Sequence, residues 1–202
     1  MGTGEPRRME DVPRQTAGAS VHEHERVDMI TAADMQDGSV VRLTPGEIRE
    51  ILPQKEPFLF INGPAEVVPG VRVHATATYP EDSFFYAGHF PGYPLTPGVI
   101  IVETMAQAAS LIILTMPEYV GQVGYFVGIK DARFFKSVFP GATVELEGRF
   151  VEERHGVVES TVEALKDGVR VARADLTCTF RSQRALTDTE RRPGPVSGAG
   201  KV

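Results

Sequence analysis

Apolar and polar residues alternate from Val71 to Tyr79, which predicts a strand with one buried face. Three further strands are expected at residues 143–154, 157–165 and 169–180. Only short turns that contain glycine separate the last three. Long strands joined by such turns predict an antiparallel meander.

The most apolar stretch of the chain runs from Val99 to Met116 and carries one formal charge, at Glu103. As a helix it would span roughly 27 Å, close to the thickness of a bilayer core. Its polar residues favour burial within the protein over a membrane span. A helix that is apolar on nearly all sides must be covered on nearly all sides, and a long curved antiparallel sheet can wrap it in this way. The pattern therefore predicts an α+β fold with one buried helix in a sheet.

The two ends of the chain lack such patterns. Residues 1–42 and 181–202 hold scattered charges and small residues with no sustained period. They cannot bury enough apolar surface to offset their chain entropy, so we expect disordered tails. The folded part is expected to be a single domain at residues 43–180.

A short helix is expected at the start of this domain. Thr44 is a suitable N-cap, and Pro45 suits the first helical position. Glu47 lies three residues after Thr44, which predicts a capping box. Pro53 then ends the helix.

Composition narrows the classes of function. A chain of 202 residues with 42% hydrophobic residues can bury one real core. The net charge of −6 argues against a general nucleic-acid binder. The single cysteine, Cys178, excludes a disulfide framework or a multi-cysteine metal site within one chain. The first residues do not form a secretory signal, so we expect a cytoplasmic protein.

A stiff connector leads into the buried helix. Prolines recur at every third position, at Pro91, Pro94 and Pro97, and each fixes its own φ angle. His89 stands at the start of this connector, so its imidazole is held by a rigid frame and can serve as a general base. A histidine that only packs within the loop is the alternative.

Glu103 is the only charged residue in the apolar helix. A carboxylate buried there costs several kcal/mol unless it is paired, hydrogen-bonded or protonated. Its pKa should therefore be raised, which suits a general acid. Gln107 lies one turn later on the same face and can hydrogen-bond the carboxyl group. A purely structural buried glutamate is the alternative.

The helix N-terminus adds a third group. The N–H of Gly98 lies where helices present unpaired donors, and it can receive a thioester carbonyl oxygen as negative charge builds there. A base, an acid and an oxyanion donor fit β-elimination next to a carbonyl group. His89 would remove the α-proton, Gly98 would hold the enolate, and Glu103 would protonate the departing β-hydroxyl.

These segments resemble a known family. The runs Gly88-His89-Phe90-Pro91-Gly92, Pro97-Gly98-Val99 and Glu103-Thr104-Met105-Ala106-Gln107 closely resemble the FabZ-type 3-hydroxyacyl-[acyl-carrier-protein] dehydratases. The resemblance implies the hot-dog fold, a long helix wrapped by an antiparallel sheet. It implies His89 and Glu103 as the catalytic pair, Gly98 as the backbone donor and Gln107 as a supporting residue. No metal and no organic cofactor is expected, because the phosphopantetheine of an acyl carrier protein carries the substrate.

The resemblance also implies partners. Lys130, Arg133 and Lys136 fall near the place where the family docks its acyl carrier protein, and an acidic carrier needs a local basic patch. A solvated charge cluster is the alternative. A homodimer is implied in which His89 of one chain faces Glu103 of the other, and a trimer of dimers is the larger assembly left open.

Several residues around the expected site depart from the family pattern. Gln54-Lys55-Glu56 stands where the family commonly has His-Arg-Tyr, and Thr96, a potential helix cap, replaces a usual methionine. The departures favour a specialised acyl or polyketide chain over general fatty-acid synthesis. The sequence predicts dehydration of a 3-hydroxyacyl thioester to the trans-2-enoyl thioester. A hot-dog thioesterase and a non-catalytic acyl-binding or assembly subunit are the alternatives.

Overall fold

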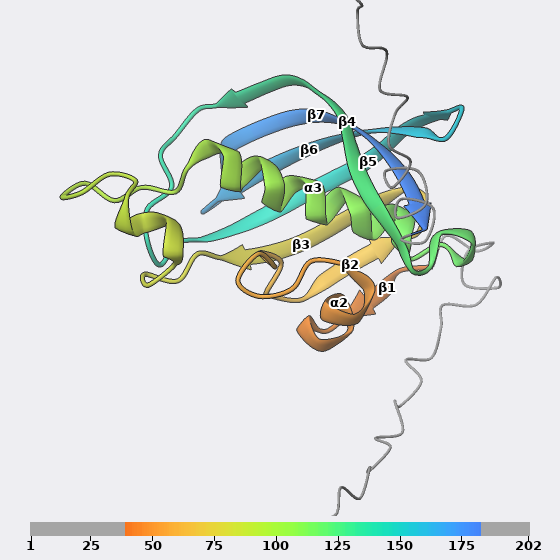
Figure 1. The fold of residues 1–202 in the computed structure, drawn as a ribbon, viewed down its shortest axis with the longest axis horizontal. Helices are drawn as coiled ribbons and strands as arrows, with labels where there is room; N and C mark the ends of the chain where they lie inside the picture. Colours follow the sequence, from red (N-terminus) through yellow and green to blue (C-terminus); the bar gives the residue numbers. More distant parts are fainter. Residues whose placement is uncertain (1–38, 183–202) are drawn as a thin grey trace, which may run out of the picture.

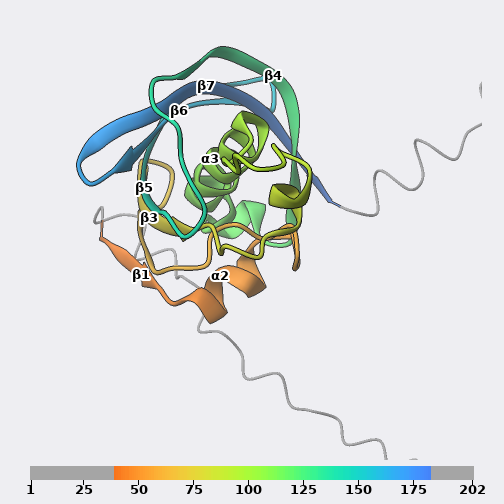
Figure 2. The same cartoon turned by 90° about the vertical axis from the view of Figure 1, so that its left-hand side faces the viewer.

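The computed structural model describes residues 39–182, and a curved sheet of seven strands wraps one long helix there (Figure 1, Figure 2). The strands are β1 (Val41–Leu43), β2 (Ala65–Val68), β3 (Arg72–Thr78), β4 (Gln122–Phe134), β5 (Thr143–Arg154), β6 (Val157–Lys166) and β7 (Val169–Ser182). Their order across the sheet is β1-β2-β3-β5-β6-β7-β4, and all neighbours are antiparallel. The helices are α2 (Pro45–Ile51) and α3 (Gly98–Leu114), with the short 3-10 helices η1 (Phe84–Ala87) and η2 (Pro117–Tyr119). The predicted α+β class is confirmed.

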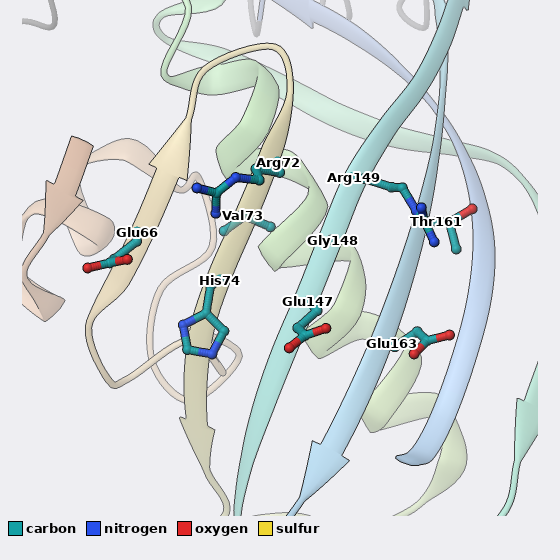
Figure 3. A pocket seen from close by; sticks show the side chains of 9 residues that line it. All are labelled: Glu66, Arg72, Val73, His74, Glu147, Gly148, Arg149, Thr161 and Glu163. Carbon is teal, nitrogen blue, oxygen red and sulfur yellow. The ribbon is translucent and has the colours of Figure 1, made fainter. Parts of the chain in front are cut away.

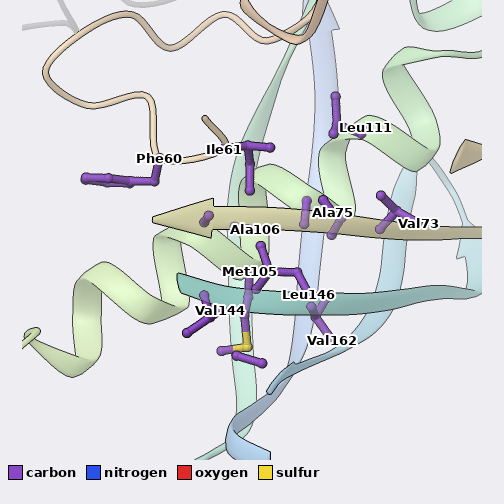
Figure 4. Close-up of a cluster of buried hydrophobic side chains, with 14 of the residues drawn as sticks. Phe60, Ile61, Val73, Ala75, Met105, Ala106, Leu111, Val144, Leu146 and Val162 are labelled. Atoms are coloured by element: carbon purple, nitrogen blue, oxygen red, sulfur yellow. The ribbon is translucent and has the colours of Figure 1, made fainter. Parts of the chain in front are cut away.

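The core lies between α3 and the concave face of the sheet. Every residue of α3 from Ile100 to Leu114 is buried except Glu103. Figure 4 shows side chains of α3, such as Met105 and Leu111, among the inward-facing side chains of β3, β5 and β6. The apolar stretch is therefore a helix covered by protein, as predicted. No helix within residues 39–182 has the length and apolar character needed to cross a bilayer.

The meander of β5, β6 and β7 matches its prediction closely. Two-residue turns join these strands, at His155-Gly156 and at Asp167-Gly168. All four turn residues have positive φ angles between 52° and 77°. This is the backbone of a type I′ turn, whose twist matches that of the flanking strands.

The domain extends slightly beyond its expected bounds. β1 begins at Val41 and β7 ends at Ser182, so each reaches two residues into a segment expected to be a tail. The remainder of both predicted tails lies outside the described residues. β2 and β4 have no counterpart among the strands predicted from the pattern. In β4 the register with β7 shifts between Phe126 and Gly128 and again between Lys130 and Arg133, which interrupts the alternation that marks a strand.

The predicted capping box at the start of α2 is present. The hydroxyl oxygen of Thr44 accepts from the Glu47 N–H at 3.3 Å, and the Thr44 N–H donates to the Glu47 carboxylate at 2.7 Å. The helix buries Ile48, and the C-cap residue Leu52 is also buried. The chain then continues as an irregular segment, residues 53–60, which is hydrogen-bonded to Gln107 of α3.

Candidate active site

His89 lies in the connector before α3, held by its own loop. Its Nδ1 atom is 3.0 Å from the carbonyl oxygen of Leu95. A carbonyl oxygen can only accept, so the neutral imidazole carries its proton on Nδ1 and leaves the lone pair on Nε2 free. Backbone hydrogen bonds close the loop, from the Leu95 N–H to the His89 oxygen at 3.2 Å and from the Tyr93 N–H to the Phe90 oxygen at 2.9 Å. The rigid frame predicted around the imidazole is present, and Nε2 is the nitrogen available as a base.

A cavity of about 600 Å³ lies at the N-terminus of α3 and brings His89 and Gly98 together. Within residues 39–182, the N–H of Gly98 donates no hydrogen bond, because the first N–H groups of a helix have no carbonyl partner one turn earlier. This donor is available to an oxygen atom in the cavity. A Cβ on Gly98 would lie 2.9 Å from the ring of Phe134, so that ring covers the helix start and leaves no space for a side chain.

Thr96, a potential helix cap in the sequence, does not cap α3. Pro97 occupies the N-cap position and makes no side-chain capping hydrogen bond. The hydroxyl of Thr96 instead lies 2.7 Å from the hydroxyl of Tyr86, and both side chains are buried. A buried hydroxyl needs a hydrogen-bond partner, and the hydroxyl of Tyr86 is that partner for Thr96. The Gly98 N–H therefore has no competing acceptor from Thr96.

Glu103 lies one to two turns into α3, half-buried, and two amides donate to the same carboxyl oxygen. Gln107 Nε2 donates to Glu103 Oε1 at 2.9 Å, and Gln54 Nε2 donates to it at 3.2 Å. Burial raises the pKa of the Glu103 carboxyl above its usual value, and the two hydrogen bonds oppose part of that shift. The predicted contact between Gln107 and Glu103 is present, and the group is suited to hold a proton as a general acid.

Gln107 is fixed from two further sides. Its Oε1 atom accepts from the Phe60 N–H at 2.8 Å, and its Nε2 atom also donates to the Phe58 oxygen at 2.9 Å. The side chain is fully buried. It therefore ties the segment 53–60 to α3 and sets the position of Glu103 relative to that segment.

Pattern analysis missed two residues of the site. Gln54 stood out only as a departure from the family, and nothing in the periodicity links it to a carboxyl group 49 positions later. Phe134 likewise carried no sign in the sequence that its ring would cover Gly98. Both contacts join segments that are distant in sequence, so no local spacing could have revealed them.

The chain presents the expected catalytic groups as two separate halves. Glu103 is absent from the residues that line the cavity of His89 and Gly98. Five residues of helix separate Glu103 from Gly98, which places it about 7.5 Å along the axis and rotated by about 140°. The expected base and the expected oxyanion donor thus share one cavity, and the expected acid with its amides lies on another face of α3.

The expected basic patch is partly neutralised within the chain. Lys130 pairs with Glu159 at 2.7 Å, and Arg133 pairs with Asp131 at 2.6 Å. Lys136 is exposed, lines the cavity of His89, and has no ion-pair partner within residues 39–182. Of the three cations, Lys136 is the one whose charge is uncompensated beside the cavity.

A second cavity, of about 460 Å³, lies on the outer face of the sheet over β2, β3, β5 and β6 (Figure 3). None of the predicted site residues lines it. Two of its carboxylates are paired, Glu66 with Arg42 and Glu163 with Arg170. His74 lies on this outer face with 43% of its side chain exposed, on the polar side of the alternating segment 71–79. Across residues 39–182, no three potential metal ligands cluster together.

Comparison with known proteins identifies the family. A family model described as the FabA-like domain matches residues 52–175. The 3-hydroxyacyl-[acyl-carrier-protein] dehydratase FabZ of Enterococcus faecalis is 41% identical over 137 residues, which cover 68% of this chain and 97% of the relative. FabZ of Herpetosiphon aurantiacus is 40% identical over 134 residues, covering 66% and 95%. The chain therefore belongs to the FabA-like family. Within that family it is a member of the FabZ type, as the sequence motifs implied.

Solved structures confirm the hot-dog fold. The dehydratase heterocomplex ApeI:P from Xenorhabdus doucetiae matches with a TM-score of 0.61 at 15% identity, over 72% of this chain and 97% of that one. A hot-dog-like protein from Thermanaerovibrio acidaminovorans matches with a TM-score of 0.52 at 16% identity, over 73% and 98%. At these identities the likeness shows the shared fold.

The raised pKa of Glu103 predicts how Glu103→Gln changes stability with pH. The native carboxyl binds its proton more tightly than the unfolded one, whose pKa is about 4.3. Wild-type stability should therefore fall relative to Glu103→Gln as pH rises above about 4, until the native pKa is passed. Urea unfolding at a series of pH values measures the difference. Glu50→Gln, at an exposed helix position, is the matched control. A wild type that gains on Glu103→Gln with rising pH would contradict the prediction.

Proposed function

We propose that this chain dehydrates a 3-hydroxyacyl thioester carried on an acyl carrier protein and releases the trans-2-enoyl thioester and water. The observation that carries the proposal is the pairing of a free imidazole nitrogen with an unbonded helix N–H in one cavity, together with a half-buried carboxyl group on another face of the same helix. Its FabZ relatives are named for this substrate class. The departures near the site favour a specialised acyl or polyketide chain as substrate.

In this reaction His89 Nε2 takes the proton from C2 of the acyl chain. The N–H of Gly98 hydrogen-bonds the thioester oxygen as negative charge develops on it. The electron pair of the broken C–H bond forms the C2=C3 double bond, and the C3–O bond breaks. Glu103 gives its proton to the departing hydroxyl, which leaves as water. His89, Glu103 and the N–H of Gly98 would supply every proton transfer and the charge stabilisation of this step, so we propose that no metal and no organic cofactor takes part.

The alternatives fit the site less well. A thioesterase needs a base that activates water, whereas burial of Glu103 favours its protonated form. A thioesterase superfamily member from Thermus thermophilus shares only the fold, with a TM-score of 0.51 and 20% identity over 61% of this chain and 90% of that one. A non-catalytic subunit would gain nothing from an imidazole fixed in one tautomer beside an unbonded N–H.

The first test is product analysis with a 3-hydroxyacyl carrier thioester. The wild-type protein should form the enoyl thioester, and His89→Ala should lose about 10²- to 10⁴-fold in rate because it lacks the general base. The fold should survive, since His89 is a loop residue outside the core. Mass spectrometry separates the outcomes. Release of free acid and thiol would show a thioesterase, and no turnover by the wild type would show a binding subunit.

We further propose that two copies of the chain complete the site. His89 and Glu103 lie on different faces of one α3, so one chain alone offers two halves. β4 ends the sheet, and its outer edge is unpaired within the described residues. Large apolar side chains are exposed along it and at the start of α3, including Val127 at 58% and Val99 at 75%. A second copy would cover this surface and bring His89 of one chain to Glu103 of the other.

Complementation tests the shared site. His89→Ala and Glu103→Gln should each be inactive alone. In a mixed dimer, one site combines both defects and the other has both native residues. Up to half of the wild-type activity per mixed dimer should therefore return. Differently tagged subunits allow purification of the heterodimer before the assay. No recovery in verified heterodimers would mean that each chain builds its own pair.

For the acyl carrier protein, we propose that it docks beside the mouth of the His89 cavity. The sequence suggested three cations for this role, Lys130, Arg133 and Lys136. Because the first two are already paired with carboxylates, Lys136 is the strongest candidate to attract an acidic partner. The exposed rings of Phe134 and Phe135 beside it offer apolar contact.

Reversing the charge of Lys136 distinguishes a role in carrier docking from a role in the reaction itself. Lys136→Glu should raise KM for the carrier-bound substrate by about tenfold, the value of one favourable charge contact at an interface. Turnover of a small pantetheine thioester should change little. Lys166→Glu, at the end of β6 and away from the cavity, is the control. Equal losses on both substrates would show that Lys136 belongs to the site itself.

A further inference from the structure

Gln54 lies at the start of the segment 53–60 and reaches across to α3. Its Nε2 atom donates to Glu103 Oε1 at 3.2 Å. Gln107 holds the same segment to α3 through the backbone of Phe58 and Phe60. The position of Gln54 relative to Glu103 is therefore set by a segment that is anchored on the same helix as the carboxyl group.

The hydrogen-bond pattern identifies the two oxygens of Glu103. The Phe60 N–H can only donate and the Phe58 carbonyl can only accept, so the amide of Gln107 has one possible orientation. Its Nε2 must face Glu103 Oε1, and Gln54 donates to that same atom. Glu103 Oε2 has no hydrogen-bond partner within residues 39–182. In the neutral acid, the oxygen that accepts two donors is the carbonyl oxygen, and the proton lies on the other.

The amide of Gln54 carries a cost in folding stability at this position. Its Oε1 atom is buried and lacks a hydrogen-bond partner within the described residues. An unsatisfied buried carbonyl destabilises a protein, and an apolar side chain of the same size would avoid that cost. Among residues 39–182, the one hydrogen bond that orients the Gln54 amide is that to Glu103. Stability alone therefore gives no reason for a glutamine here.

We propose that Gln54 is a positioning residue that, together with Gln107, binds Glu103 Oε1 and so makes Oε2 the oxygen that delivers the proton to the leaving hydroxyl. The identity of that proton acceptor rests on the dehydration proposed above. The two amides have different tasks. Gln107 fixes the segment and the carboxyl group to each other, and Gln54 adds the second donor. That donor sets the rotation of the carboxyl group and stabilises the carboxylate left after proton transfer.

Gln54→Met tests this role, because methionine keeps the length of the side chain and removes both polar atoms. The variant should lose about 10- to 100-fold in kcat, the value of a hydrogen bond to a charged group, with KM nearly unchanged. The loss of a donor raises the pKa of Glu103, so the alkaline limb of the pH–rate profile should move to higher pH. Its melting temperature should equal or exceed that of the wild type, since the orphaned carbonyl is gone.

Two further variants complete the series. Gln54→His restores an N–H donor at the same position and should recover part of the lost kcat. Gln122→Met removes an amide that bonds the backbone of Glu118, away from the site, and should leave kcat and the pH profile unchanged. A melting temperature that falls in Gln54→Met with an unshifted pH profile would show a structural role and overturn the proposal.

A measurement that does not depend on turnover tests the role of Gln54 separately from the proposed dehydration. Carbon-13 NMR of labelled glutamate carboxyl groups follows the titration of Glu103, whose signal is identified by its loss in Glu103→Gln. Glu103 should titrate at higher pH in Gln54→Met than in the wild type. An identical titration in both proteins would refute the positioning role. If the wild type forms no enoyl product, the proposed reaction fails, and the NMR comparison still decides whether Gln54 acts on Glu103.

Discussion

The burial of one carboxyl group in an otherwise apolar helix is the constraint on which the rest of the structure depends. The sheet wraps α3 to cover its apolar side chains, and the same covering removes water from Glu103. A helix cannot supply lateral donors from its own backbone, so they must come from side chains. One comes from Gln107 on the next turn, and the other from a segment that crosses α3. The path of residues 53–60 is therefore as much part of the site as the helix.

The expected base, His89, is held by a loop and not by a buried helix. His89 lies in a connector at the rim of the sheet, where a closed loop fixes the imidazole and the start of α3 leaves an N–H unbonded. One helix thus serves both groups, at its end and along its side. Because these places face different directions, no rotation of side chains can merge them in one chain. The proposed dimer would cover the apolar side chains that are exposed on β4 and at Val99.

Local patterns predicted the parts of the fold that local forces decide. The strand at residues 143–154 was predicted with its observed bounds, because alternation and a two-residue turn mark its ends. β4 was missed because two register shifts break its alternation. In the site, Glu103 stood out as a lone charge on an apolar helix. Thr96, a potential helix cap, instead has a buried hydroxyl, that of Tyr86, as its partner. Residue type alone cannot show which hydrogen-bond partner a side chain takes when the fold decides which partners lie close to it.

The fold by itself does not select the reaction, since the solved structure of a thioesterase superfamily member shares it. The protonation state of one carboxyl group can select it. In the proposed reaction, a neutral Glu103 would donate a proton to the leaving hydroxyl, whereas an ionised one would draw a proton from water and favour hydrolysis. Burial favours the neutral form, and each donated hydrogen bond favours the ionised form. Two amides on a single oxygen reconcile these demands. They hold the carboxyl group and stabilise it after proton transfer, and they leave the second oxygen free to carry the proton.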